Sequence, residues 1–128
     1  MGHTNGLLLD ERVVAVQPSL VRAIGLTKAV VLQQLHWHLG AAGHGREHAG
    51  EVWFPITQTV LAEETGLTAQ VVRRALEALE QEGIVLSIQP EGRQSRRKWY
   101  RIDLAHDRFV QVAKPPDGKG RNRPFLFF

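Results

Sequence analysis

Polar side chains between residues 57 and 98 form a set that suits hydrogen bonding to duplex DNA. Arginine can pair in a bidentate way with guanine and glutamine with adenine, whereas cations beside phosphates add affinity that carries little sequence information. We predict DNA contacts for residues with hydroxyl, amide or cationic groups, namely Thr57, Thr68, Gln70, Arg73, Arg74, Arg93, Gln94, Ser95, Arg96, Arg97 and Lys98. The first five belong to two predicted helices, and the other six to an arginine-rich turn.

Covalent catalysis has no comparable set of residues. The chain contains no cysteine and only three serines, and no histidine or carboxylate is placed in the sequence to activate a nucleophile. We therefore expect neither an enzyme nor a bound cofactor.

Four histidines, His36, His38, His44 and His48, raise the question of a metal site. His36 and His38 are two residues apart and point to different faces of a helix. The other two lie in a glycine-rich loop without a carboxylate at a spacing typical of metal ligands. The pattern favours a packed His36 and solvent-exposed loop histidines, and we expect no metal site.

The elements that must position the polar set begin with two helices. Thr57 is a helix-capping residue before a helix over residues 58–65, and Gly66 is suited to end it. After a three-residue turn, Thr68 caps a second helix over residues 69–82. This helix carries an apolar stripe at spacings of three and four, formed by Val72, Ala75, Leu76 and Leu79. The stripe turns Gln70, Arg73 and Arg74 outward, as in a recognition helix.

Two strands rich in β-branched and aromatic residues follow, over residues 84–89 and 98–102. The arginine-rich turn between them makes a basic wing over residues 90–98. Residues 51–56, EVWFPI, are expected to be a third strand of the same small sheet, and residues 40–50 a loop. Trp53 and Trp99 are expected to pack as core or cross-strand aromatics and not to stack on bases.

Two further helices are expected before this unit. Pro18 suits the first position of a short helix that Gly25 ends. Thr27 is expected to cap a longer helix over residues 28–39, whose buried side carries Val31, Leu32, Leu35 and Leu39. The apolar runs at residues 7–9 and 13–16 could be edge strands or packing segments. The predicted fold is α+β, a winged helix-turn-helix with about four helices and a small antiparallel sheet.

Length and charge suggest one domain with a basic tail. The 128 residues divide into an N-terminal segment, 1–17, a winged helix-turn-helix domain, 18–104, and a C-terminal tail, 105–128. Residues 1–89 hold six Lys/Arg against nine Asp/Glu, about −3, whereas residues 90–128 hold ten against four, about +6. Positive charge gathered on the wing and tail indicates a polyanionic partner. The N-terminus lacks a basic segment followed by a long apolar run, so we expect no membrane partner and a cytoplasmic location.

Three runs of the sequence resemble a known protein family. The runs PSLVRAIGLTKAVVLQQLHWHLG, TGLTAQVVRRALEALEQEGIVLS and RKWYRIDL are similar to the N-terminal winged-helix domain of plasmid and phage replication initiators and replisome organisers, including DnaD-like proteins. The resemblance spans roughly residues 16–104. It implies double-stranded DNA as partner, repeated origin sequences as targets, assembly as a homodimer or larger species, and recruitment of a replication protein through another region, here reduced to the tail.

Two other functions remain open. One is a winged-helix transcriptional regulator. The other is a protein-interaction module that uses the winged-helix face and the terminal aromatics PFLFF, which should dock on this domain, on a second copy or on another protein. The residues also have structural interpretations: Arg73 and Glu77, four apart, could form a surface ion pair, and the basic hairpin could be a solvated edge strand.

Overall fold

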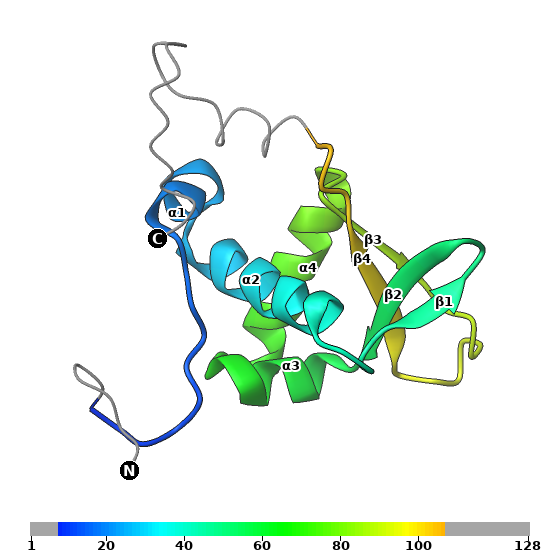
Figure 1. Cartoon of the computed structure of the whole chain (residues 1–128), viewed down its shortest axis with the longest axis horizontal. Coiled ribbons are helices and arrows are strands. Elements are labelled where there is room, and N and C mark those ends of the chain that lie inside the picture. Colours follow the sequence, from blue (N-terminus) through cyan, green and yellow to red (C-terminus); the bar gives the residue numbers. More distant parts are fainter. Residues whose placement is uncertain (1–7, 107–128) are drawn as a thin grey trace.

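A computed structural model describes residues 8–106. In chain order the elements are α1 Pro18–Ile24, α2 Leu26–Gly40, β1 Arg46–His48, β2 Glu51–Ile56, α3 Gln58–Thr65, α4 Ala69–Gln81, β3 Val85–Ile88 and β4 Lys98–Ile102. The strands form one antiparallel sheet in the order β1-β2-β4-β3, and the helices lie to one side of it (Figure 1). The predicted α+β winged helix-turn-helix is thereby confirmed. No helix within these residues is long and apolar enough to cross a membrane.

The helix-turn-helix has the predicted local chemistry. The Thr57 hydroxyl accepts a hydrogen bond from the Val60 amide at 3.1 Å, and the Thr68 hydroxyl accepts one from the Val71 amide at 3.1 Å. Gly66 ends α3 in the left-handed conformation, with φ of 78°, which glycine adopts without the steric cost that a Cβ brings. Both helices of the motif therefore begin and end within one residue of the predicted positions.

The junction between α1 and α2 differs from the prediction. Pro18 begins α1 as predicted, but Thr27 does not cap α2. The Gly25 carbonyl accepts the Ala29 amide at 3.0 Å, so α2 begins directly after Gly25 and Thr27 lies inside its first turn. The expected Thr27 cap is therefore wrong, because the glycine that ends α1 also starts α2.

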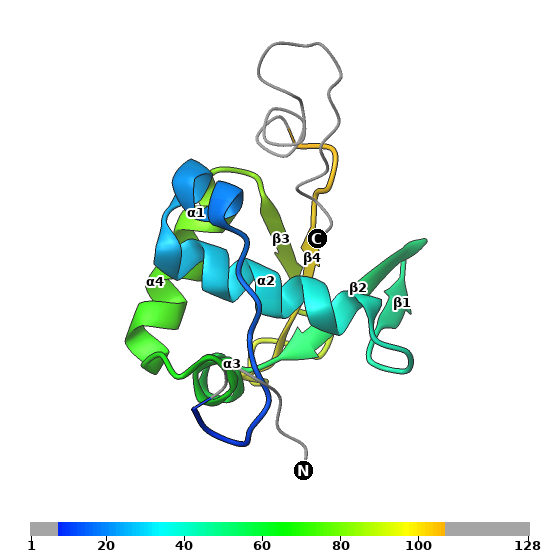
Figure 2. The ribbon, with the colours of Figure 1, turned by 60° about the vertical axis from the view of Figure 1, so that its left-hand side comes forward.

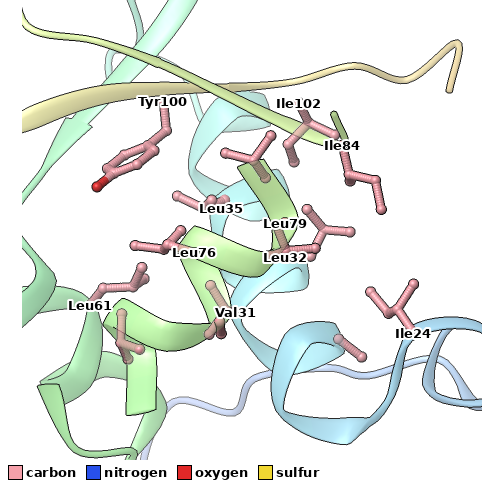
Figure 3. Packing of buried hydrophobic residues seen from close by; sticks show 14 of the residues in the cluster. Ile24, Val31, Leu32, Leu35, Leu61, Leu76, Leu79, Ile84, Tyr100 and Ile102 are labelled. Atoms are coloured by element: carbon pink, nitrogen blue, oxygen red, sulfur yellow. The ribbon is translucent and has the colours of Figure 1, made fainter. Parts of the chain in front are cut away.

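The core lies between the helices and one face of the sheet. All four residues of the α4 stripe are buried, with at most 4% of Ala75 exposed. They meet side chains of α2, α3 and β4, and Figure 3 shows Leu76 and Leu79 of α4 among Leu35, Leu61 and Tyr100. Burial, followed by the nearby Glu80 carboxylate, raises the pKa of the Tyr100 phenol to about 12, so this core residue stays neutral.

The segments flanking α2 depart furthest from expectation. Residues 46–48 of the predicted loop form β1, which pairs with β2 through a tight turn in which Ala49 (φ 53°) and Gly50 (φ 85°) are both left-handed. All three β1 residues are exposed, so no alternation of apolar residues marked this strand. At the N-terminal side, residues 8–16 form no strand. Val16 packs against the core, whereas Leu8, Leu9 and Val13 are exposed.

The buried histidine is His38, and His36 is exposed, which reverses the prediction. His38 follows Val31 and Leu35 on the buried side of α2. Its Nε2 lies 2.7 Å from Oε1 of Glu64 in α3, its Nδ1 lies 3.0 Å from Nδ1 of His44, and its ring stacks on Phe54 at 4.0 Å. His44, predicted to be solvent-exposed, is half-buried, because its ring packs beside His38.

We expect His38→Ala to lower the free energy of unfolding by about 2–3 kcal/mol, because it removes a buried ring that stacks on Phe54 and its hydrogen bonds with Glu64 and His44. The matched control is His36→Ala, two residues away on the exposed face, which should change stability by less than about 0.5 kcal/mol. Urea denaturation followed by circular dichroism measures both. Equal effects would show that the His38 contacts contribute nothing.

Ala49→Asn should stabilise the β1–β2 hairpin by about 0.5–1 kcal/mol, since asparagine tolerates the left-handed conformation better than alanine and Asn-Gly is a favoured sequence for such turns. Ala42→Asn is the control, because Ala42 is exposed and its φ is not positive. Thermal denaturation should show a higher Tm for the first variant only. A gain of the same size in both would point to a general effect of asparagine.

Candidate nucleic-acid interface

The outward face of α4 carries four of the predicted contact residues. Thr68, Gln70, Arg73 and Arg74 are all exposed, and they occupy the N-terminal cap and first turns of the helix. They face outward because the inward stripe fixes the rotation of the helix about its axis. The Thr68 hydroxyl accepts the Val71 amide at the cap, which leaves its own O–H free to donate to a phosphate.

Arg73 makes the surface ion pair that the sequence allowed. Its guanidinium lies 3.5 Å from the Glu77 carboxylate, and the two side chains are 47% and 58% exposed. Exposed pairs of this spacing contribute only about 0.3–0.5 kcal/mol, so Arg73 is easily released to another partner. Arg74, its neighbour, makes no ion pair with any residue of the described part of the chain.

The wing is the loop between β3 and β4, whose strands pair from Val85 opposite Ile102 to Ile88 opposite Trp99. Arg93, Gln94 and Arg96 are exposed on it, and neither arginine has an ion pair among residues 8–106. Lys98 begins β4 and is half-buried. The two exposed arginines are therefore available to phosphates.

Glu91 organises the rest of the wing, and the sequence did not single it out. Its carboxylate accepts hydrogen bonds from the Ser95 hydroxyl at 3.0 Å and the Trp99 indole at 3.2 Å, and it forms an ion pair with Arg97. The hydrogen bond from Arg97 is the main reason that the pKa of the Glu91 carboxyl falls to about 2. Ser95 and Arg97, both predicted DNA contacts, are thus engaged inside the wing. The one glutamate within the arginine-rich run PEGRQSRR is the feature of the sequence that could have indicated this role.

Charge is divided unevenly between the two halves of the site. Residues 57–83, which span the helix-turn-helix, hold two arginines against five glutamates, a net charge of −3. Residues 90–102, which span the wing and β4, hold five cations against one glutamate, a net charge of +4. Arg97 pairs with Glu91 and Arg101 with Glu51, so the cations of this segment that have no ion pair within residues 8–106 are Arg93, Arg96 and Lys98.

The two sets of residues lie at the same end of the molecule. Both the N-terminal end of α4 and the wing loop lie toward the lower side in two views (Figures 1 and 2). Thr57 is the exception among the predicted residues, because it is half-buried and its hydroxyl caps α3. A surface with outward polar groups on a helix and cations on a loop at the same end of the molecule can contact bases and phosphates of one duplex.

The aromatic residues near the wing have packing roles. Trp53 is buried on the sheet face opposite the helices, with the Arg101 guanidinium 5.6 Å from its ring centroid. Trp99 is half-buried, hydrogen-bonded to Glu91, and edge-on to His48. Both agree with the predicted cross-strand packing. Within residues 8–106 no group of three histidine or acidic side chains could hold a metal ion.

Comparison with protein families identifies the central part of the chain. The Crp-like helix-turn-helix domain matches residues 29–95, from within α2 through α3, α4 and most of the wing. The comparisons with curated proteins and with solved structures gave no match. The matched segment covers more than half of the 128 residues and contains the entire helix-turn-helix. The chain therefore belongs to the Crp-like helix-turn-helix family and contains a winged helix-turn-helix DNA-binding domain.

Proposed function

We propose that the chain binds specific duplex DNA sequences, with α4 in the major groove and the wing on the phosphate backbone. The observation that carries this proposal is the exposed polar face on the first turns of α4. The exposed groups there are the Gln70 amide and the Arg73 and Arg74 guanidinium groups, on a helix whose opposite side is fully buried. Side chains at this end of a recognition helix reach base edges when the helix enters the groove.

The charge distribution supports a division of labour between helix and wing. The helix-turn-helix has a net charge of −3, so it cannot supply the long-range attraction to DNA. The wing can supply this attraction, because Arg93, Arg96 and Lys98 form no ion pair in the described part of the chain. Counting these cations and Arg74 as four phosphate contacts gives a slope of log affinity against log salt of roughly −3 to −4.

Membership of the Crp-like helix-turn-helix family favours a transcriptional regulator. The resemblance to plasmid and phage replication initiators supplies the alternative, in which the targets are origin repeats and the chain acts as a homodimer with a replication-protein partner. The two roles predict different binding sites, an operator overlapping a promoter or a repeated origin sequence. An interaction module that binds protein is the third function, and neither it nor the other two needs an enzymatic activity.

The cations of the wing should add affinity that does not depend on DNA sequence. Replacing Arg93 and Arg96 together by alanine should weaken binding about equally on all duplexes and reduce the salt slope by about 1.8, because each lost phosphate contact removes about 0.9. Fluorescence anisotropy of labelled duplexes across a salt series measures this. Arg22→Ala is the matched control, since Arg22 is exposed on α1, distant from the wing in Figure 1. Absence of wild-type binding even at low salt would leave only the protein-interaction function.

The polar residues on the first turns of α4 should supply the preference for one sequence over another. Gln70→Ala or Arg73→Ala should reduce the preference for the target over random duplex by about 1–3 kcal/mol, because each removes a candidate bidentate base contact. Gln81→Ala, exposed at the other end of the same helix, should leave the preference unchanged. The same anisotropy assay with target and random duplexes compares the three variants. An equal loss on every sequence would show that these residues contact only the backbone.

A further inference from the structure

The wing contains an anion-binding arrangement that is already occupied by one of its own side chains. Three donors converge on the Glu91 carboxylate, the Ser95 hydroxyl on one oxygen and the Arg97 guanidinium and Trp99 indole on the other. Ser95 is further held by the Arg97 amide, which donates to its hydroxyl at 3.1 Å. A single carboxylate therefore fixes the geometry of the loop from Glu91 to the start of β4.

The same donors suit a phosphate diester. A backbone phosphate presents two unesterified oxygens that share one negative charge, as a carboxylate does, and it accepts charge-assisted bonds from arginine and neutral bonds from hydroxyl and N–H groups. The members of the arrangement, Glu91, Ser95, Arg97 and Trp99, alternate in sequence with the cations of the wing that have no ion pair among the described residues, Arg93, Arg96 and Lys98. A duplex drawn to these cations would bring phosphates up to the occupied arrangement.

We propose that Glu91 is an internal stand-in for a DNA phosphate, which a backbone phosphate displaces from Arg97, Ser95 and Trp99 when duplex DNA binds. This inference rests on the proposed DNA-binding function and adds a regulating residue to it. Displacement is feasible because the Arg97 and Glu91 side chains are 46% and 30% exposed, and exposed ion pairs are weak. Glu91 thereby weakens binding to every sequence without altering the base-reading face of α4.

Near neutral pH, protonation does not free Glu91 from its hydrogen-bond donors. The hydrogen bond from Arg97 lowers the pKa of the Glu91 carboxyl to about 2, so the carboxylate stays charged wherever the protein would bind DNA. Removal of the charge requires a substitution. Glu91→Gln is suitable because it preserves the size of the side chain. An amide oxygen in the place of Oε2 can still accept from the Trp99 indole, and the NH2 group in the place of Oε1 can donate to the Ser95 hydroxyl. The loss of charge weakens the contact with the Arg97 guanidinium.

Glu91→Gln should tighten binding about 3- to 10-fold on target and random duplexes alike, as measured by fluorescence anisotropy. Glu47→Gln is the matched control, because Glu47 is exposed on β1 and has no cation among its described ion pairs. It changes net charge by the same amount, and its gain should be under about twofold. In an Arg97→Ala background the gain from Glu91→Gln should fall to that of the control.

The outcomes separate this inference from the proposed function. If the wild type binds DNA and Glu91→Gln binds equally or more weakly, Glu91 merely shapes the wing and the inference is overturned. It is also overturned if the full gain persists in the Arg97→Ala background, which would indicate general charge repulsion. If no variant binds duplex at low salt, the proposed function itself fails and this inference fails with it.

A second measurement locates the displacement. The indole N–H resonance of Trp99, assigned by loss in Trp99→Phe, should shift on adding duplex to the wild type, because its acceptor changes from carboxylate to phosphate. The resonance of buried Trp53 should stay in place. An unmoved Trp99 resonance in a saturated complex would show that Glu91 keeps its donors and would reject the exchange.

Discussion

Burial of one side of α4 is the constraint on which the rest of the structure depends. Val72, Ala75, Leu76 and Leu79 are between 0% and 4% exposed, and they pack against α2, α3 and the sheet. Because this contact fixes both the position of α4 and its rotation, it also fixes which residues face solvent. The outward direction of Gln70, Arg73 and Arg74 is therefore a consequence of core packing and needs no separate interaction.

A polar contact completes the placement of the motif by joining α3 to α2. The Glu64 carboxylate oxygen accepts from Gln34 at 2.8 Å and lies 2.7 Å from the His38 ring. Buried polar groups need such partners, and here one carboxylate serves two side chains of α2 that are 4–5% exposed. The contact holds the Glu64 carboxylate, whose side chain is 31% exposed, against α2.

Features set by neighbours in the chain were predictable, and features set by distant contacts were not. The Thr57 and Thr68 caps, the Gly66 turn and the α4 stripe depend on residues within a few positions, and the sequence predicted all of them. Strand β1 is wholly exposed and exists only through pairing with β2, so its sequence carries no periodic signal. His38 follows Val31 by seven residues and Leu35 by three, so the period of α2 already favoured it over His36 as the buried histidine. Its contacts with Glu64 and Phe54, however, come from other elements. The part played by Glu91 required knowing how the wing folds back on itself.

The division of charge bears on how a small domain could discriminate among sequences. Specificity is the ratio of target affinity to affinity for the many competing sites, and phosphate attraction raises both terms equally. An acidic helix-turn-helix, at −3 over residues 57–83, lowers the attraction common to all DNA, whereas the base contacts that we propose for Gln70 and Arg73 would favour the target alone. Glu91 acts in the same direction on the wing, because it engages one of the five cations there. In the proposed function, a limited attraction to all DNA means that the exposed polar residues of α4 decide on which sequence the domain stays bound.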